Sequence, residues 1–172
     1  QHIASQIIRL HVIANSDETA DQTLKKEVKD RVVTYLRSKM NQAASIQAAR
    51  QVICQEMDAL KEIAEKKIRQ EGYDYPVTVS LGTTYFPVKE YGDMAFPAGD
   101  YEALRVQIGK SKGRNWWCVM YPSLCLVDGV YQTVPENSKD KLKQVLSTSE
   151  YQSLVDGGED VQFRLRFFDW LF

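Results

Sequence analysis

The sequence predicts an α+β domain, in which a helical hairpin and short C-terminal helices pack on a largely antiparallel sheet. An alternating strand at residues 7–14 is followed by two long segments with helical spacing of apolar residues. After Gly72 the period changes to two, and several short alternating segments follow. Because the 172 residues show no repeat and no low-complexity tract, we expect one domain over residues 1–172, with a frayed N-terminal segment at residues 1–6.

The first strand is predicted at residues 7–14, where apolar residues at the even positions alternate with Arg9, His11 and Ile13. We expect His11 to lie partly exposed on the more polar face of this strand. The strand should end at the turn-forming sequence Asn-Ser-Asp of residues 15–17, which would also cap the helix that follows.

A helical hairpin should come next. The first helix is predicted at about residues 19–40, because its apolar residues recur every three or four positions. This spacing leaves Lys25, Lys26, Lys29 and Arg37 on the outward side. A second helix should begin after Ser45 as its cap and end at Gly72. The short connection between the two helices favours an antiparallel pair.

The second half of the chain supplies most of the sheet. Strands are predicted at residues 76–82, 101–108, 116–121 and 161–168. The second and third of these should pair as a hairpin around a long loop. Residues 91–99, with two glycines and a proline, predict a turn-rich connection. Residues 128–137 predict an irregular bridge that leads to the short C-terminal helices.

Two of the three cysteines, Cys118 and Cys125, stand close together in the sequence on either side of Pro122. A tight reversal at the proline would bring their Cα atoms within disulfide range, and neither zinc-knuckle nor CxxC spacing is present. We therefore predict a structural disulfide, with two reduced cysteines packed as small apolar side chains as the alternative. Cys54 lies in a helical pattern and is expected to be a buried free thiol.

The cellular compartment and the net charge of the chain limit the kinds of partner that it can bind. A disulfide indicates an oxidising compartment. The start at Gln1 in place of Met indicates a trimmed chain, and removal of an N-terminal signal or anchor would fit this start. No run approaches the ~20 apolar residues of a membrane span. Lys and Arg number 22 against 23 Asp and Glu, and the basic cluster Lys110, Lys112 and Arg114 is expected to be a solvated loop. These features predict no nucleic-acid partner.

The sequence carries no motif for catalysis, metal binding or a cofactor. It has two histidines and no GxGxxG, P-loop or HExxH pattern. Ser16, His11 and Asp17 could be drawn as a triad, but the nucleophile-elbow motif is absent. We therefore predict a non-enzymatic interaction protein without metal or cofactor, while a pair of carboxylates that meets across the fold stays open.

Aromatic residues form the candidate binding surface. They are Trp116, Trp117 and Tyr121 in one predicted strand, and Phe168 and Trp170 near the C-terminus. Both sides of these strands could belong to the core. Otherwise one side forms an exposed aromatic strip, a kind of surface that is rich in binding hot spots.

Four segments resemble, in the family's order, the stage II sporulation protein R family of endospore-forming bacteria. They are IRLHVIANSDETADQTLKKEVKDRV, EGYDYPVTVSLG, YFPVKEYGDMAFPAGDYEALRVQIG and NWWCVMYPSLC. The resemblance implies a signalling protein that the forespore secretes into the intermembrane space between forespore and mother cell. It further implies a partner, the membrane-embedded aspartic peptidase stage II sporulation protein GA, which cleaves pro-sigma-E; the chain would be peripheral to the membrane through this partner.

Two questions about function stay open from the sequence. Asn15, Asp17 and Asp21 either terminate the strand and start the helix or are read by the peptidase. The alternative functions are an extracytoplasmic cell-wall hydrolase, with sugar rings stacked on tryptophan, and a carbohydrate- or peptide-binding module.

Overall fold

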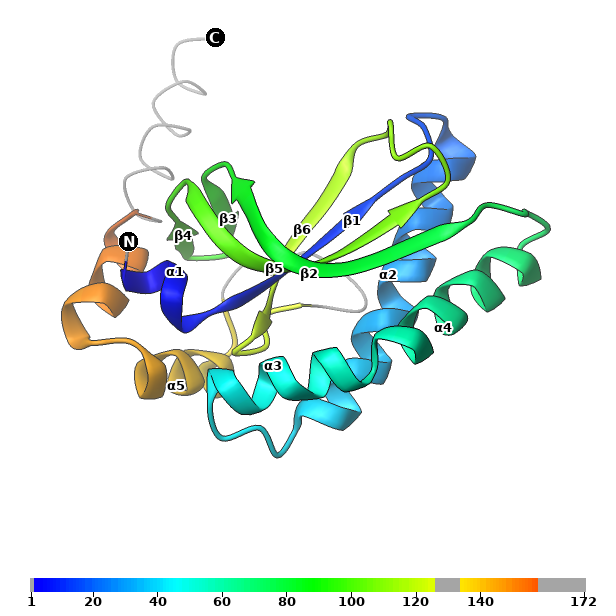
Figure 1. The fold of residues 1–172 in the computed structure, drawn as a ribbon. Helices are drawn as coiled ribbons and strands as arrows, with labels where there is room; N and C mark the ends of the chain where they lie inside the picture. Colours follow the sequence, from blue (N-terminus) through cyan, green and yellow to red (C-terminus); the bar gives the residue numbers. More distant parts are fainter. Residues whose placement is uncertain (1, 126–133, 158–172) are drawn as a thin grey trace, which may run out of the picture.

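The computed structural model describes residues 2–125 and 134–157. Its elements are α1 (His2–Gln6), β1 (Ile8–Ile13), α2 (Thr19–Met40), α3 (Ile46–Gln55), α4 (Met57–Gln70), β2 (Val77–Phe86), β3 (Lys89–Tyr91), β4 (Met94–Phe96), β5 (Gly99–Ile108), β6 (Asn115–Tyr121) and α5 (Glu136–Val145). A further helix begins at residue 148. This arrangement confirms the predicted α+β class (Figure 1). The strand expected at residues 161–168 lies outside the described residues.

The main sheet has four strands in the order β2-β5-β1-β6. β1 pairs in parallel with β5 and antiparallel with β6, so that Arg9 lies between Ala103 and Val119. The predicted hairpin of residues 101–108 with 116–121 is therefore wrong, because β1 separates these two strands. All six residues of β1 are buried, which is typical of a central strand covered on both faces.

Helices α2, α3 and α4 cover one face of the sheet (Figure 1). Leu10 and Val12 of β1 belong to the same buried cluster as Val28 and Val32 of α2. The segment expected as one second helix is divided into α3 and α4 at Glu56, whose backbone N–H donates to carbonyls of the preceding turn. Ser45 caps α3 as predicted, accepting a hydrogen bond from the Ala48 N–H at 3.1 Å.

The opposite face carries a second hydrophobic core at one end of the sheet. Met94 and Phe96 of β4 are buried there, so residues 91–99 form part of a small hairpin with β3 and not only a turn-rich connection. Residues 2–6, which we expected to be frayed, form α1, and Ile3 packs against this core. Leu142 of α5 is also buried in it, within a helix that begins inside the segment expected to be an irregular bridge.

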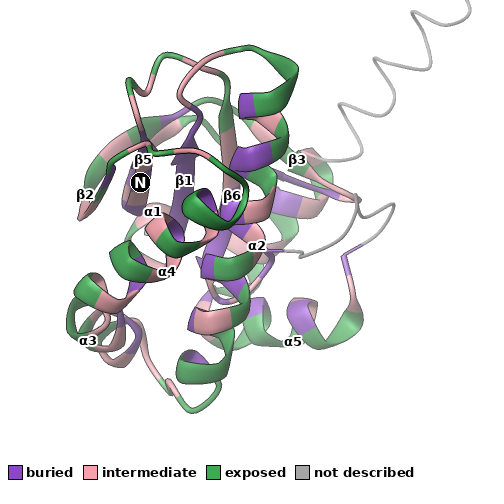
Figure 2. Ribbon diagram, turned by 90° about the vertical axis from the view of Figure 1, so that its right-hand side faces the viewer, coloured by how far each residue is buried: buried purple, intermediate pink, exposed green. Residues whose placement is uncertain are grey.

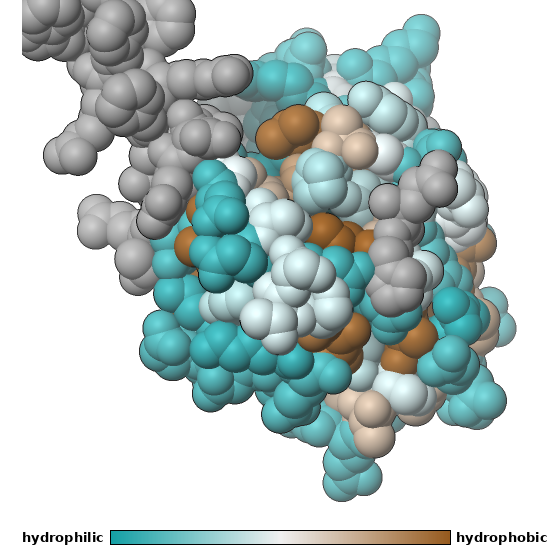
Figure 3. Space-filling view, turned by 90° about the vertical axis from the view of Figure 1, so that its left-hand side faces the viewer, coloured by the Kyte–Doolittle hydropathy of each residue, from teal (hydrophilic) through white to brown (hydrophobic). Residues whose placement is uncertain are grey.

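Exposure differs strongly between the centre and the edge of the sheet. Figure 2 shows the central strands buried and β2, at the edge, exposed over much of its length. Tyr85 and Val88, near the end of β2, are exposed large apolar residues. Seen from the side of α1 and α5, apolar residues form small separate patches between polar ones (Figure 3). Among the described residues, no helix is long and apolar enough to cross a membrane.

Candidate functional site

The turn after β1 is joined to the loop between β5 and β6. Asn15 Oδ1 accepts a hydrogen bond from the Lys110 N–H at 2.9 Å, and the Gly113 N–H donates to the Ala14 carbonyl at 3.0 Å. Asp17 Oδ1 accepts from the Arg114 N–H at 2.7 Å. These three hydrogen bonds hold the β5–β6 loop across the end of β1, so that β6 can pair with the edge of β1 opposite to β5.

Asp21 of α2 is the buried anchor of this turn, with 4% of its surface exposed. Its Oδ2 accepts hydrogen bonds from Asn15 Nδ2 at 2.8 Å and from Ser16 Oγ at 2.6 Å. Burial raises the pKa of Asp21, but the hydrogen bonds from Ser16, Asn15 and Tyr75 outweigh it, so the pKa is lowered below its ordinary value. Asp21 therefore stays ionised and holds the turn against the helix.

The expected capping role of residues 15–17 is corrected in one respect. α2 begins after Glu18, and no side chain caps it. Ser16 Oγ does accept from the Glu18 N–H at 3.2 Å, just before the helix, whereas Asp17 is turned toward Arg114. The turn residues end the strand as predicted. Their side chains bind the β5–β6 loop and Asp21, and they do not cap the helix.

Two lysines of α2 that we expected to point outward are buried instead. Lys25 Nζ donates to Gln22 Oε1 at 2.7 Å and to the Arg114 carbonyl at 3.0 Å, and burial lowers its pKa to about 8. Lys29 forms an ion pair with Asp30, and its Nζ lies 4.4 Å from the centre of the Trp116 ring. Long lysine stems can cover apolar surface in this way while the charged ends keep polar partners.

The two adjacent tryptophans lie on opposite faces of the sheet, each half-buried. Trp116 faces α2 and Lys29. Trp117 is stacked on His11, with ring centroids 3.8 Å apart, on the other face. Val119, which shares a face with Trp117, is fully buried. β6 therefore presents two separate aromatic positions and no continuous strip; Phe168 and Trp170 lie outside the described residues.

Arg9 and His11 are the features that sequence reasoning missed. Arg9 is fully buried, its guanidinium lies 4.1 Å from the centre of the Phe86 ring and 4.7 Å from that of Tyr101, and its Nη2 donates to the Tyr91 hydroxyl at 2.8 Å. His11 is 5% exposed, which corrects the expectation of a partly exposed residue, and burial lowers its pKa to about 4. In the sequence, each of these two residues stands between two apolar neighbours. A nearly continuous apolar run of this kind is typical of a strand that is buried on both faces.

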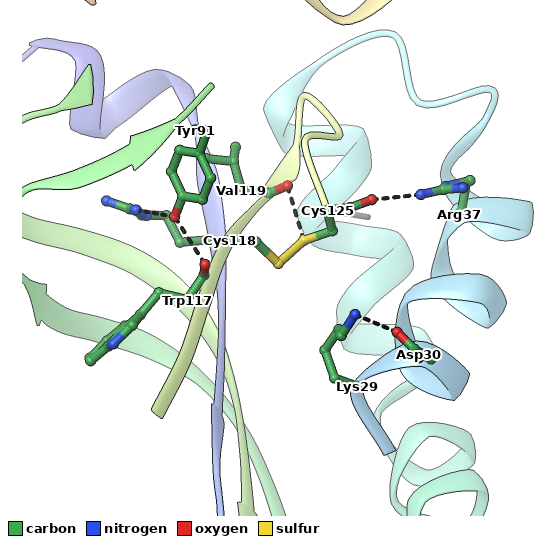
Figure 4. Close-up of a disulfide and its surroundings, with 9 residues drawn as sticks. Lys29, Asp30, Arg37, Tyr91, Trp117, Cys118, Val119 and Cys125 are labelled. Carbon is green, nitrogen blue, oxygen red and sulfur yellow. Dashed lines mark hydrogen bonds and ion pairs between the residues drawn. A yellow bond between two sulfur atoms is a disulfide. The ribbon is translucent and has the colours of Figure 1, made fainter. Parts of the chain in front are cut away.

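The predicted disulfide is present. Cys118 at the centre of β6 is bonded to Cys125, with Cα atoms 5.4 Å apart. The loop between them returns against β6, where the Leu124 N–H donates to the Val119 carbonyl at 2.9 Å. Figure 4 shows the disulfide beside α2, where Arg37 Nη2 donates to the Cys125 carbonyl at 2.6 Å. The third cysteine, Cys54, is free but exposed, whereas we expected it to be buried.

Opening the disulfide will lower stability. For a loop this short, chain entropy predicts a loss of about 2–3 kcal/mol when Cys118 and Cys125 are both changed to Ser. Urea unfolding of the variant and the parent gives this difference. As a control, Cys54→Ser should leave stability unchanged, because its side chain is exposed. Thiol counting on the denatured, unreduced parent should find one thiol; a count of three would contradict the pairing.

A cavity of about 600 Å³ lies next to the disulfide loop. The end of α2, residues 120–123, Cys125 and α5 contribute to its lining, and Tyr121 is the one predicted aromatic residue among the described lining residues. Across residues 2–125 and 134–157, no group of three or more His, Cys, Asp or Glu side chains could hold a metal ion. The described surface therefore offers a cleft and polar turns as candidate sites.

The fold and these features define a disulfide-bonded α+β protein in which a cleft lies beside the disulfide loop. A sequence model of the Stage II sporulation protein R family matches residues 4–131, and the chain belongs to this family. It is 37% identical over 139 residues to the curated "Stage II sporulation protein R" of Bacillus subtilis (strain 168). That alignment covers 81% of this chain and 62% of the relative. No solved structure matches the chain significantly.

Proposed function

We propose that this chain is a secreted sporulation signal that activates the membrane-embedded peptidase stage II sporulation protein GA, which then processes pro-sigma-E. The observation that carries the proposal is the family match over residues 4–131, which includes the turn after β1, the whole main sheet and both disulfide cysteines. The curated relative is named for sporulation and not for a catalysed reaction.

The disulfide supports a location outside the cytoplasm. Disulfides persist in oxidising compartments and are rare where cellular reductants keep thiols reduced. Cys118 and Cys125 join the centre of β6 to the loop that follows it. We place the chain in the space between forespore and mother cell, where the peptidase would be reached from outside the mother-cell cytoplasm.

Activation by this chain needs binding and no turnover. An activator shifts its target only by binding the active state more tightly than the inactive state, and a tenfold preference corresponds to about 1.4 kcal/mol. A few buried contacts in an interface can supply that difference, because truncation of one hot-spot residue costs ~2 kcal/mol or more. The extent of processing should therefore follow the fraction of peptidase that is bound.

Co-expression in a bacterium that does not sporulate tests the proposal. The cells carry the peptidase, pro-sigma-E and this chain fused to an export signal, and immunoblotting measures the shortened sigma-E. We expect processing only when the chain is exported, with the same chain lacking the export signal as the matched control. Absence of processing, together with release of soluble fragments from purified peptidoglycan, would contradict activation and favour the cell-wall hydrolase.

A further inference from the structure

The cavity beside the disulfide loop lies where the two hydrophobic cores meet. Among its lining residues, Met120 and Cys125 belong to the core under α2–α4, whereas Val145 of α5 packs against the core on the other face of the sheet. Between these two groups of packed residues lies a cavity of about 600 Å³. This volume falls within the range of roughly 300–1,000 Å³ that is typical of small-molecule pockets.

The walls of this cavity are held in place before any ligand binds. The disulfide fixes residue 125, and Arg37 of α2 donates a hydrogen bond to the Cys125 carbonyl at 2.6 Å. On the opposite wall, Ser138 of α5 donates to the Ser123 carbonyl at 3.3 Å, and Leu142 anchors the helix in the second core. A preformed site costs a ligand less ordering entropy than a mobile one.

The lining has the chemistry of a peptide site. Apolar groups from each wall contribute to it: Met40, Met120 and Val145. Side-chain amides lie among them: Asn41, Asn137 and Gln144. An amide offers both a donor and an acceptor, as the backbone of an extended peptide does. In such a cleft, the apolar groups can contact alternate side chains of an extended peptide, and the amides can form hydrogen bonds with its backbone.

The charge of the lining is one-sided. It contains Arg37 and Lys141, and none of the described lining residues is Asp or Glu. Lys141 is exposed and forms no ion pair within residues 2–125 and 134–157, unlike its neighbour Lys139, which lies 2.7 Å from Asp93. Because these two cations face no Asp or Glu within the described lining, they attract a carboxylate and disfavour a basic ligand.

We propose that this cavity binds an extended, acidic segment of a partner protein. The identity of the partner rests on the proposed function, under which the segment belongs to the peptidase or to a protein bound to it. The recognition itself rests on the lining alone: apolar walls, amides for the backbone and two cations for a carboxylate.

Binding of a defined peptide tests the recognition without any activation. The probe is a fluorescein-labelled peptide of alternating Glu and Val, and a Lys-Val peptide of the same length is the control. Fluorescence anisotropy with the purified chain should show saturable binding of the Glu-Val peptide, at least tenfold tighter than that of the Lys-Val peptide. Equal affinity for the two peptides, or no binding of either, overturns the proposal.

Matched variants locate the binding. Lys141→Glu should weaken binding of the Glu-Val peptide at least tenfold, whereas Lys66→Glu, the same charge change at an exposed position of α4 outside the cavity, should change it less than twofold. Ala44→Trp should block the cavity, with Ala20→Trp at an exposed position near the start of α2 as its control. All four positions are exposed, and thermal unfolding checks that each variant keeps its fold. Unchanged binding by both Lys141→Glu and Ala44→Trp excludes the cavity as the site.

The same variants in the co-expression assay separate this inference from the proposed function. Processing that needs the exported parent chain but survives Lys141→Glu and Ala44→Trp would retain the function and reject the cavity as its docking site. Peptide binding in the cavity without any processing would retain the site and reject the function.

Discussion

Gly113→Ala should destabilise the protein by about 3 kcal/mol, at the upper end of the usual cost of overpacking. A Cβ at position 113 would overlap the carbonyl oxygen of Ser16, which is backbone and has no alternative rotamer. The Gly113 N–H also donates to the Ala14 carbonyl at 3.0 Å, so a shift that relieves the overlap would break the contact between the two segments. Urea unfolding measures the difference in the free energy of unfolding.

Gly82→Ala is the matched control for this substitution. Gly82 lies in β2, and a Cβ built there meets no atom within 4 Å. We expect a change within about 0.5 kcal/mol, as is usual for surface substitutions. If Gly113→Ala proved equally neutral, the close approach of the turn to the β5–β6 loop would be contradicted, since no side-chain motion can make room for the methyl group.

Acid should destabilise the protein between about pH 6.5 and pH 4 through His11. Its pKa is lowered from 6.5 to about 4, first by burial and also by the charge of Arg105. In this window the unfolded chain binds a proton that the folded chain does not, so stability falls as the pH falls. The loss in the free energy of unfolding reaches about 3 kcal/mol at the acid end of this window. Above pH 6.5 His11 causes no such loss.

His11→Phe isolates this effect. A phenyl ring keeps a flat ring against Trp117, which His11 meets at an interplanar angle of 12°, and removes the titrating group. Urea unfolding of parent and variant from pH 8 to pH 4 should show parallel curves above pH 6.5 that separate below it, with the variant losing less stability. Asp21 and Asp93, whose pKa values are lowered, lose their contribution at lower pH and do so in both proteins. Curves that stay parallel throughout would exclude His11 as the source.

The periodicity of the sequence was enough to predict the local elements. Helical spacing placed α2 correctly, and alternation placed β1, β5 and β6 within a residue or two of their bounds. These patterns are local, because an apolar face recurs at a period that the backbone geometry imposes. The disulfide of Cys118 with Cys125 was predictable for the same reason: it depends on a short loop and not on distant packing.

The family was also a property of the sequence, because the resemblance rested on residues in a set order and the match covers residues 4–131. Of the residues predicted to bind a partner, the structure brings Asn15 and Asp21 together at one turn and places Tyr121 at the cavity. Their binding role stays a prediction, and the cavity variants probe only the site that Tyr121 lines.

Only the tertiary structure decided the order of the strands and the burial of charged residues. β1 is inserted between β5 and β6, and its pairing partners lie more than ninety positions away along the chain. Its two faces meet two separate cores that are likewise built from distant segments. Arg9 and His11 read as polar positions in a half-exposed strand, yet the aromatic rings of Phe86, Tyr101 and Trp117 cover them. Burial is a property of what packs against a residue, and these partners come together only when the chain is folded.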